Sequence, residues 1–260
     1  SFSRKLASKY GQAGIVLANN VLAHTDNPIA FVKGVKNILD SNGVFVFEFQ
    51  YGLELIKNTE FDNIYHEHSS FFTIRPLKLL MEKSGMRLFD IKPVATQGGS
   101  LRCYATHAEN GFYKRTTASA KMEKREIREG MNKLKTYDDF GKRAMAIKTS
   151  LLNIILNIKK DGKRIVAYGA PAKGNTLLNF CGIGPELIEY CIEKTEFKVN
   201  KFTPGMHIPV VSDDIIKKDG YPDFYLVLIW NYLDAIYARE KEYRKNGGKF
   251  IIPNPSPRII

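Results

Sequence analysis

The fold of this chain is constrained most by strand segments that are apolar on both faces. Residues 44–49 (Val-Phe-Val-Phe-Glu-Phe) form one such segment, and residues 225–230 (Tyr-Leu-Val-Leu-Ile-Trp) form another near the C-terminus. A strand that is apolar on both faces must be covered on both faces, as in a parallel sheet between two layers of helices. The sequence therefore predicts an α/β fold built on parallel strands.

Helix signals alternate with strand signals in the first 112 residues. Asn27-Pro28 predicts the start of a helix, and Ser41-Asn42-Gly43 predicts its end. A second helix is expected at about 74–84, and further strands are expected at 14–18, 87–91 and 100–105. No glycine-rich turn precedes Ile15, although a doubly wound domain normally opens with one. This first unit is therefore expected to be half of a domain.

The rest of the chain divides into a helical stretch and a second α/β unit. Residues 118–160 are charged, poor in glycine and periodic, which predicts two amphipathic helices. From Asp161 onward strands alternate with helices again, and the expected strands are 164–168, 187–192, 225–230 and 250–252. No membrane span is expected, because no apolar run is long enough to cross a bilayer.

Charge and cysteine content narrow the class of protein. The net charge is +12, but the lysines are spread along the chain and many stand beside acids, which is typical of solvated helix faces. No nucleic-acid motif accompanies the charge, so a nucleic-acid partner is not expected, although a positive surface would help to collect an anionic substrate. The three cysteines have no CxxC spacing, which favours free thiols in a reducing cytoplasm.

Four neighbouring side chains that can carry or position protons occur in Tyr65-His66-Glu67-His68. A histidine can remove a proton near neutral pH, and an adjacent carboxylate such as Glu67 can orient the imidazolium that forms. His24, which follows the polar strand end Asn19-Asn20, is a third histidine that could join the group. A surface turn is the alternative interpretation. A metal site is disfavoured because the helical HExxH spacing is absent.

Residues 169–175 (Gly-Ala-Pro-Ala-Lys-Gly-Asn) follow a strand and open a helix. Amide groups at the start of a helix, together with Lys173, suit a phosphate or pyrophosphate. Glu193 ends the next strand, where an acid that binds a ribose is expected. Pro171 replaces a glycine of the dinucleotide-binding pattern, which argues against a nicotinamide cofactor. A plain strand-to-helix turn is the alternative.

Two further loops could approach a ligand. Gly98 and Gly99 precede Ser100 and Arg102, and paired glycines let the backbone come close to a bound molecule, although a simple hairpin turn would explain them equally. His207 lies in a proline-bounded loop at 202–209, where a structural role is as well supported as ligand binding.

Taken together, these segments resemble the S-adenosylmethionine-dependent C-methyltransferases of nucleotide-activated deoxysugars. The matching stretches follow the family's order over nearly the whole chain: 17–24, 61–68, 98–102, 169–184 and 203–209. The resemblance implies three parts: a partial Rossmann-like methyltransferase domain at 1–112, a helical connector at 113–160, and a Rossmann-like domain at 161–260 that binds the nucleotide sugar. It also implies that an N-terminal zinc domain and the first half of the methyltransferase domain are missing. The chain is therefore expected to be truncated and to hold no zinc itself, and its own methyltransferase activity stays open.

The resemblance also assigns roles to individual residues. The family's reaction removes a proton next to a 4-keto group, and the enolate then attacks a sulfonium methyl. His68 matches the proposed base with Glu67 beside it, whereas Tyr65 and His24 match groups that steady the keto sugar or its enolate. Asn19 and Asn20 match the strand end that approaches S-adenosylmethionine. The residues expected to bind the nucleotide sugar are Gly98, Gly99, Ser100, Arg102, Tyr168, Gly169, Ala170, Lys173, Asn175, Glu193 and His207.

Two other functions stay open at this point. One is a nicotinamide-dependent oxidoreductase built on the C-terminal unit, and the other is a non-catalytic module that binds a nucleotide sugar. The expected partner is a nucleotide-diphosphate sugar, with neither nucleic acid nor membrane. The sequence leaves open the sugar, the methylated carbon, the nucleotide base, and whether the protein is a monomer or a dimer.

Overall fold

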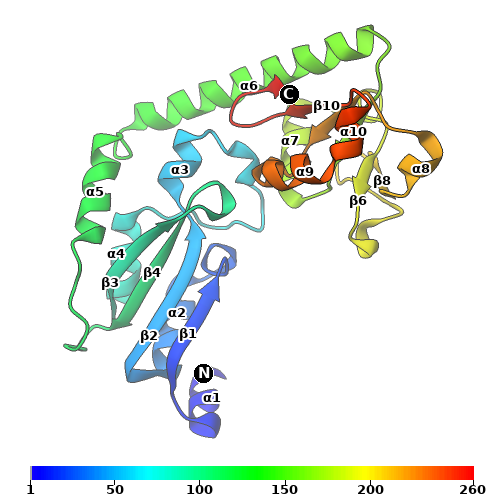
Figure 1. The fold of residues 1–260 in the computed structure, drawn as a ribbon. Helices are drawn as coiled ribbons and strands as arrows, with labels where there is room; N and C mark the ends of the chain where they lie inside the picture. Colours follow the sequence, from blue (N-terminus) through cyan, green and yellow to red (C-terminus); the bar gives the residue numbers. More distant parts are fainter. Residues whose placement is uncertain (1) are drawn as a thin grey trace. The chain divides into compact units, whose positions relative to one another are not determined.

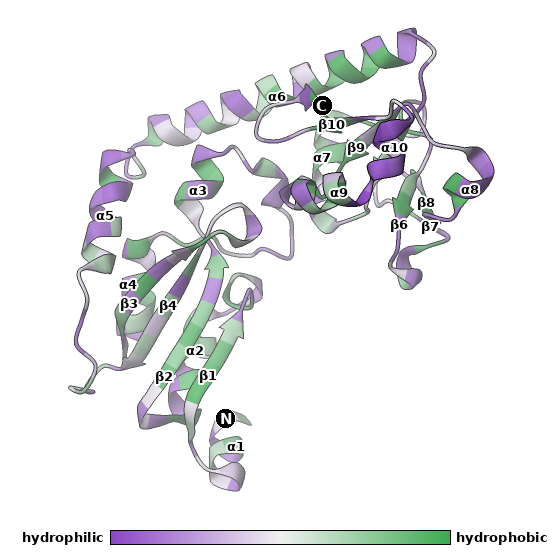
Figure 2. Ribbon diagram, viewed as in Figure 1, coloured by the Kyte–Doolittle hydropathy of each residue, from purple (hydrophilic) through white to green (hydrophobic). Residues whose placement is uncertain are grey.

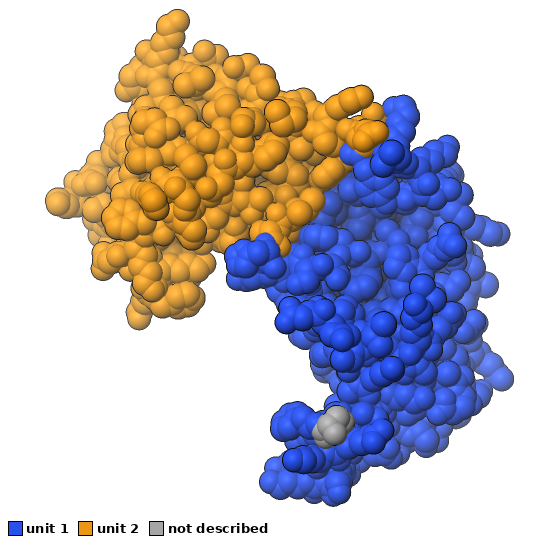
Figure 3. Space-filling model, turned by 180° about the vertical axis from the view of Figure 1, so that it is seen from behind, with its two compact units in different colours: residues 1–57, 66–137 blue, residues 58–65, 138–260 orange. Residues whose placement is uncertain are grey.

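The computed structural model describes residues 2–260, so only the first residue of the predicted 1–112 domain lies outside it. The chain forms two compact units, which Figure 3 colours separately. Unit 1 contains residues 1–57 and 66–137, and unit 2 contains residues 58–65 and 138–260. Each unit has its own sheet and its own buried core, and each is described here by itself.

Unit 1 is built on a four-stranded sheet with the strand order β1-β2-β4-β3 (Figure 1). β1 runs parallel to β2, whereas β4 is antiparallel to both β2 and β3. The strands are β1 (Ala13–Asn19), β2 (Leu39–Gln50), β3 (Met86–Val94) and β4 (Ser100–His107). The helices are α1 (Phe2–Tyr10), α2 (Pro28–Ile38), α3 (Gly52–Lys57), α4 (Ile74–Lys83) and α5 (Ala118–Arg128), with the short 3-10 turns η1 (Leu22–His24) and η3 (Thr96–Gly98).

The predicted start of α2 is confirmed, whereas its predicted end at residues 41–43 is wrong. Asn27 caps α2, because its side-chain oxygen accepts a hydrogen bond from the Ala30 amide at 2.9 Å, and Pro28 is the first helical residue. The helix ends at Ile38, however, and residues 41–43 lie inside β2 rather than at the helix end. Gly43 permits this early strand, because an added Cβ would stand 2.9 Å from the Ala13 carbonyl oxygen of β1.

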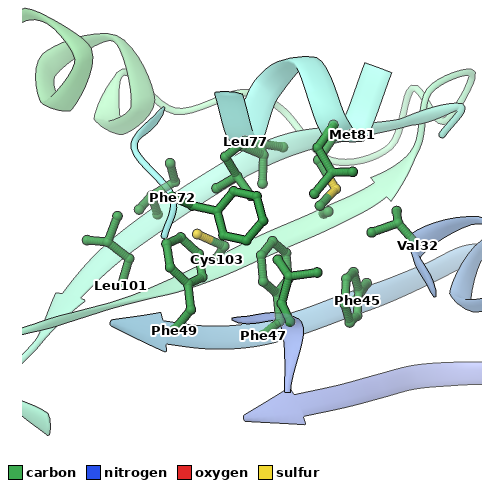
Figure 4. Close-up of a cluster of buried hydrophobic side chains, with 14 of the residues drawn as sticks. Val32, Phe45, Phe47, Phe49, Phe72, Leu77, Met81, Leu101 and Cys103 are labelled. Carbon is green, nitrogen blue, oxygen red and sulfur yellow. The ribbon is translucent and has the colours of Figure 1, made fainter. Parts of the chain in front are cut away.

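The buried face of β2 forms the core of unit 1. Phe45, Phe47 and Phe49 alternate along this strand and pack against residues of α4, such as Leu77 and Met81, which Figure 4 shows on the same side of the sheet. Phe45 and Phe47 stack with ring centroids 4.5 Å apart. Burying an aromatic side chain of this size contributes roughly 2–3 kcal/mol each, so this row of phenylalanines holds the helices of unit 1 on the sheet.

Glu126 of α5 is buried in unit 1 and holds two elements together. Its Oε1 accepts hydrogen bonds from the Tyr51 hydroxyl and from the Ile74 amide, both at 2.7 Å. Burial raises the pKa of Glu126 above its usual value of 4.5. The folded state therefore binds the proton more tightly than the unfolded state, and this carboxyl stabilises the fold less as the pH rises through its folded pKa.

We expect Glu126→Gln and Glu126→Ala to behave differently in denaturant unfolding. The glutamine carbonyl oxygen can still accept both hydrogen bonds, so Glu126→Gln should match the wild type near pH 4 and become the more stable protein as the pH rises. Glu126→Ala leaves two buried donors without an acceptor and should lose about 2–3 kcal/mol near pH 4, with a smaller loss as the pH rises and the wild type itself becomes less stable. A glutamine variant that loses as much as the alanine variant would contradict this account.

Unit 2 is a seven-stranded sheet with the order β11-β10-β9-β5-β6-β8-β7. Its inner strands pair in parallel, and the two edge strands β7 and β11 are antiparallel to their neighbours. The strands are β5 (Ile165–Tyr168), β6 (Cys191–Glu193), β7 (Lys201–Phe202), β8 (Pro209–Ser212), β9 (Phe224–Val227), β10 (Lys249–Ile252) and β11 (Arg258–Ile259). The four strands expected from the sequence are present, although β6 starts four residues later than predicted and β9 ends at Val227 rather than at Trp230. The short strands β7, β8 and β11 were not predicted.

Helices complete unit 2 as the sequence predicts for a parallel sheet. They are α6 (Leu134–Lys160), α7 (Ala172–Cys181), α8 (Ile215–Asp219), α9 (Leu233–Arg239) and α10 (Lys241–Lys245), with the 3-10 turns η2 (Phe61–Asn63), η4 (Glu196–Lys198) and η5 (Trp230–Tyr232). One buried cluster packs α6 and α7 on the sheet, and a second one contains Ile236 of α9 and Tyr243 of α10. Helices therefore pack on the sheet in two separate buried clusters, and unit 2 has a Rossmann-like α/β fold. The two helices predicted within 118–160 are confirmed as α5 and α6.

Candidate active site

Several predicted site residues meet at the edge of unit 1 where β1 and β2 both end, which we call the carboxyl edge. Asn19, the last residue of β1, lies opposite Glu48 near the end of β2. The Asn20 amide then donates a hydrogen bond to the Glu48 carbonyl at 2.9 Å, with Asn20 in a left-handed conformation at φ 55°. An asparagine tolerates this conformation better than most residues, so the turn is compatible with its sequence.

Arg102 reaches the carboxyl edge from the antiparallel strand β4. It pairs with Glu48 in the register of β2 and β4, and its Nε lies 2.5 Å from the Glu48 Oε1. The Glu48 carboxylate is buried, whereas the Arg102 guanidinium is half exposed. Glu48 therefore fixes the Arg102 side chain while part of the guanidinium stays accessible. The site residues predicted from the sequence did not include Glu48, and its place as the polar residue at the end of an apolar strand was the available signal.

His24 and His68, which are 44 residues apart in the sequence, lie together at the carboxyl edge. Their ring centroids are 4.8 Å apart in an edge-to-face arrangement. His24 ends the turn η1, which begins two residues after Asn20. The Ser70 amide holds the segment after His68 by donating to the Ala23 carbonyl at 3.3 Å. His68 is partly buried, whereas His66 and Glu67 are exposed. The structure thus joins two of the predicted catalytic histidines in one place.

Tyr65 belongs to the segment 58–65, which packs into unit 2, whereas the next residue already belongs to unit 1. Its side chain is partly buried. The tetrapeptide 65–68 therefore spans the point where the chain passes from one unit to the other. The structure describes Tyr65 with unit 2, and its grouping with His24 and His68 stays a prediction.

The loop at Gly98 and Gly99 precedes β4 and is held in place by contacts with other residues of unit 1. An added Cβ at Gly99 would stand 2.8 Å from the Glu54 side chain, and the Gly99 carbonyl accepts the Tyr51 amide at 3.0 Å. Ser100 is buried, and its hydroxyl donates to the Thr96 carbonyl at 3.0 Å. These contacts explain Gly99 without a ligand, and the binding roles of Gly98, Gly99 and Ser100 stay predictions.

The turn at 169–175 in unit 2 likewise depends on close packing. Gly169 has φ +83°, and an added Cβ there would stand 3.2 Å from Ile229. A Cβ at Gly174 would stand 3.0 Å from the Leu228 Cβ, so α7 can lie against this segment only because it has a glycine there. Pro171 is the residue before the first helical turn and caps α7 without a side-chain hydrogen bond.

Glu193 is already engaged by backbone groups. Its Oε2 accepts the Ala170 amide at 3.1 Å, and its Oε1 accepts the Lys194 and Thr195 amides at 2.9 and 3.1 Å. Burial by itself raises the pKa of Glu193, but hydrogen bonds from these amides outweigh it and lower the pKa overall. A ribose hydroxyl would therefore have to share this carboxylate with the turn that it stabilises.

Lys173 is directed into the interior of unit 2. Its ammonium lies 2.5 Å from the Asn231 Oδ1 and 4.1 Å from the centroid of the Trp230 ring. Only 9% of the residue is exposed. The Lys173 charge already has protein partners in this structure, and its binding of a phosphate stays a prediction. The Trp230 ring in turn donates a hydrogen bond from its Nε1 to the Asp62 Oδ2 at 2.6 Å. The sequence-predicted site residues did not include Asp62.

Two hollows flank the 169–175 turn at the ends of the unit 2 strands. One, of about 140 Å³, is lined by Tyr168, Gly169, Ile192, Glu193, Lys194, Asp213, Ile229 and Arg239. The other, of about 290 Å³, is lined by Ala170, Ala172, Asn175, Lys198, Lys201, Phe202, Thr203, Pro204 and Val210. Ligands of parallel α/β sheets bind at this end of the strands. His207 is exposed in the loop 203–208 and lines neither hollow.

Two further kinds of site, a metal centre and a membrane span, are absent from the part of the chain that the structure describes. Within residues 2–260, no three His, Cys, Asp or Glu side chains gather in a way that could hold a metal ion. Across the same residues, no helix combines the length and the apolar character that a bilayer span requires. Cys103, Cys181 and Cys191 are buried free thiols.

Comparisons with known proteins agree with this architecture. The family profile described as C-methyltransferase C-terminal domain matches residues 95–255, and the profile described as Methyltransferase domain matches residues 2–90. The C-methyltransferase NovU of Streptomyces niveus is 36% identical over 257 residues, which cover 98% of this chain. The chain spans 60% of the length of that relative.

Solved methyltransferase structures resemble smaller parts of the chain. Magnesium protoporphyrin IX methyltransferase (ChlM) from Synechocystis PCC 6803 is 15% identical with a TM-score of 0.31, covering 39% of this chain and 48% of ChlM. The O-methyltransferase NcsB1 from neocarzinostatin biosynthesis is 17% identical with a TM-score of 0.31, covering 36% of this chain and 29% of NcsB1. From the match of its larger part to the family profile, the chain belongs to the C-methyltransferase family.

Proposed function

We propose that this chain is part of an enzyme that transfers a methyl group from S-adenosylmethionine to a carbon of a nucleotide-linked 4-keto-deoxysugar. The observation that carries the proposal is the pairing of His24 and His68 at the carboxyl edge, beside Asn19 and Asn20. Two imidazoles at this edge supply a base and a hydrogen-bond donor within one small region. Proton removal next to a ketone requires both a base and a hydrogen-bond donor to the oxygen.

The proposed reaction begins with His68. Its imidazole removes the proton from the carbon next to the keto group, and the electron pair of that C–H bond moves to form an enolate. Glu67 stabilises the imidazolium, while His24 and Tyr65 donate hydrogen bonds to the oxygen on which negative charge develops. The enolate carbon then forms a bond to the methyl group, and the proton on His68 passes to solvent. S-adenosylmethionine, when bound, would supply the electrophilic methyl, whose bond to sulfur would break with its electron pair left on the thioether S-adenosylhomocysteine.

The residues present fit one side of a methyl-donor site. Asn19 is the last residue of β1 and Asn20 follows it, and both residues are exposed at the carboxyl edge. β1 pairs only with β2 among the described strands, although Ile15 and Leu17 are 65% and 67% exposed on it. Figure 2 shows this strand as hydrophobic along much of its length. A strand with an unpaired edge and exposed apolar side chains favours a further pairing segment, which supports the proposal that the full enzyme is longer.

We further propose that unit 2 binds the nucleotide diphosphate at the 169–175 turn. The larger hollow contains Lys198 and Lys201, and the exposed ring of Phe202 offers a surface on which a base can stack. α7 begins at the same turn without a side-chain cap, and amide groups at the start of a helix favour an anion. An oxidoreductase is less well supported, because Pro171 and the engaged Glu193 occupy the positions that a dinucleotide would use.

A calorimetric titration of this chain with TDP, UDP and GDP tests the nucleotide proposal. We expect micromolar binding of one nucleotide, with an affinity that falls as the salt concentration rises, because lysines contact the phosphates. Lys201→Met should weaken this binding about fivefold, an effect of about 1 kcal/mol. Lys217→Met removes a charge that is paired with Asp214 on α8, and it should leave the affinity unchanged. Binding of none of the three at millimolar concentration would contradict a nucleotide site in unit 2.

A further inference from the structure

Unit 1 contains a polar hollow of about 200 Å³ where α4, β3 and α5 pack against one another (Figure 1). Arg87 of β3 lines this hollow and pairs with Thr106 of β4, four residues along that strand from Arg102 at the carboxyl edge. The hollow is therefore separate from the candidate active site. Its volume is below the roughly 300–1,000 Å³ of sites for drug-sized molecules, which favours a small ligand.

Cationic side chains dominate the lining of this hollow. Lys78 of α4, Arg87 of β3 and Arg115 of the loop before α5 line it, together with one acid, Glu82, among the described residues. Burial lowers the pKa of Arg87, and the nearby Arg115 charge lowers it further. Two guanidinium groups that share a small space repel each other unless an anion lies close to both. The hollow therefore has an excess of positive charge that a bound anion would neutralise.

Arg87 is held in place by uncharged groups. Its Nη2 donates to the carbonyls of Asn110 and Tyr113 at 2.5 and 2.7 Å, and its Nε donates to the Asn110 carbonyl at 3.2 Å. Within the described part of the chain, no carboxylate pairs with this guanidinium, and its Nη1 has no hydrogen-bond partner. A carbonyl orients an arginine without neutralising it. Arg87 therefore keeps its charge and one nitrogen for a ligand.

Arg115 belongs to a loop that is fixed on both sides. Tyr113 stacks on Phe89 of β3 with ring centroids 4.7 Å apart. Thr116 donates its amide to the Phe89 carbonyl at 2.8 Å and its hydroxyl to the Asp90 Oδ1 at 2.7 Å. Arg115 itself is exposed and forms no ion pair with any described residue. A ligand would therefore meet an arginine whose backbone is already ordered, which lowers the entropic cost of binding.

Backbone amides add donors to the same hollow. Ser119 and Ala120 line it from the first turn of α5, and their amides donate to no acceptor among the described residues. Thr117 precedes this helix of 11 residues and provides no side-chain cap. Such amides favour an anion, although they do not make a site by themselves. A phosphoryl group offers three oxygens to the amides and the two guanidinium groups, whereas a carboxylate offers two.

We propose that this hollow binds a phosphoryl group, either of free phosphate or of a small phosphate monoester, between Arg87, Arg115 and the first turn of α5. The site does not depend on the proposed function, and it is separate from the nucleotide site proposed in unit 2. Its donors come from β3, from the loop before α5 and from α5, so the bound anion joins these elements. Glu82 repels the anion and limits the affinity.

A calorimetric titration of this chain with inorganic phosphate at constant ionic strength tests the site. We expect a Kd of about 1 mM or tighter. Arg115→Gln should weaken the binding about tenfold or more, the usual effect of losing a hydrogen bond between charged groups. Arg128→Gln is the matched control at an exposed arginine in the last turn of the same helix, and its affinity should stay within about twofold. Equal losses in the two variants, or no binding at about 20 mM phosphate, would overturn the site.

Glu82→Gln should change the affinity in the opposite direction. It removes the negative charge from the lining, so phosphate should bind about twofold to fivefold more tightly than to the wild type. This variant guards against an Arg115 variant that folds poorly, because a disrupted hollow would not gain affinity. Weaker binding by Glu82→Gln than by the wild type would overturn the proposed role of charge in this hollow.

Amide NMR shifts test where the phosphate binds. Inorganic phosphate should shift the Ser119 and Ala120 amide resonances with the same midpoint as in calorimetry. Shifts confined to residues 169–175 would overturn the site in unit 1 and assign the phosphate to unit 2. Glycerol phosphate distinguishes the two sources of the phosphoryl group. Binding at least as tight as that of inorganic phosphate would support a monoester ligand, whereas a loss of about tenfold or more would support free phosphate.

Discussion

His68→Asn is expected to lower methyl transfer by the full-length enzyme by about 10²–10⁴-fold, the usual contribution of a general base. Asparagine is close to histidine in size and can donate a hydrogen bond, but it cannot take up a proton near neutral pH. The nucleotide affinity should stay within about twofold, because His68 lies at the carboxyl edge of unit 1 and the proposed nucleotide site is in unit 2. Transfer of a labelled methyl group and calorimetry measure the two quantities.

A second readout isolates the proton-removal step. Without the methyl donor, the wild-type enzyme should exchange the proton next to the keto group of the sugar with deuterium from the solvent, and His68→Asn should not. His66→Asn is the matched control, because it is the same substitution two residues away at an exposed histidine, and it should retain most of the activity. Near-normal turnover of His68→Asn, or equal losses in both variants, would remove His68 as the base.

The contact between His24 and His68 illustrates what a sequence can and cannot predict. Each histidine stands beside other polar groups at the end of a strand or turn, and this pattern indicates a site. Parallel strands end at the same edge of a sheet, so polar residues at such ends are expected to meet. The helix cap at Asn27 is also predictable, because it depends on a local contact: the Asn27 side chain accepts a hydrogen bond from a backbone amide three residues later.

The cluster around Asp62 is the opposite case. Trp230 is 168 residues from Asp62 in the sequence, and no local pattern indicates that the segment 58–65 leaves one sheet to pack on the other. Lys173 therefore resembled a free phosphate ligand, although its partner comes from a distant part of the chain. The short strands β7 and β11 have two residues each, too few for a period of two to be visible. Tertiary contact, and not propensity, decides all of these features.

The glycines of unit 2 show how a motif can serve packing as well as binding. Gly169 and Gly174 belong to the turn proposed to hold the nucleotide, yet both face Ile229 and Leu228 in the segment directly after β9. A glycine that lets a helix approach a sheet closely is a known part of the dinucleotide-binding pattern. The turn can therefore keep this spacing whether its ligand is a dinucleotide, a sugar nucleotide or none. Its presence alone says little about the ligand.

The second large effect is expected at Gly174. A Cβ there would stand 3.0 Å from the Leu228 Cβ and 3.1 Å from the Pro171 ring, and both neighbours are fixed by the backbone. Gly174→Val adds two further carbons on a buried face of α7, so either the helix must move off the sheet or the side chain must take a strained rotamer. We expect a loss of about 3 kcal/mol in the free energy of unfolding, at the upper end of overpacking effects. Denaturant unfolding of the purified chain measures it.

Gly141→Val supplies the control because it makes the same change in the long helix α6. No heavy atom would lie within 4 Å of a Cβ at Gly141, and the position is exposed. Valine forms helix somewhat better than glycine, so this variant should be as stable as the wild type or more stable by up to about 0.5 kcal/mol. A large loss in the free energy of unfolding at position 174, with no loss at position 141, would establish that close packing of α7 requires glycine at 174. Helix propensity would not explain such a difference. Equal losses in both variants would show that valine weakens any helix here and that Gly174 has no special contact.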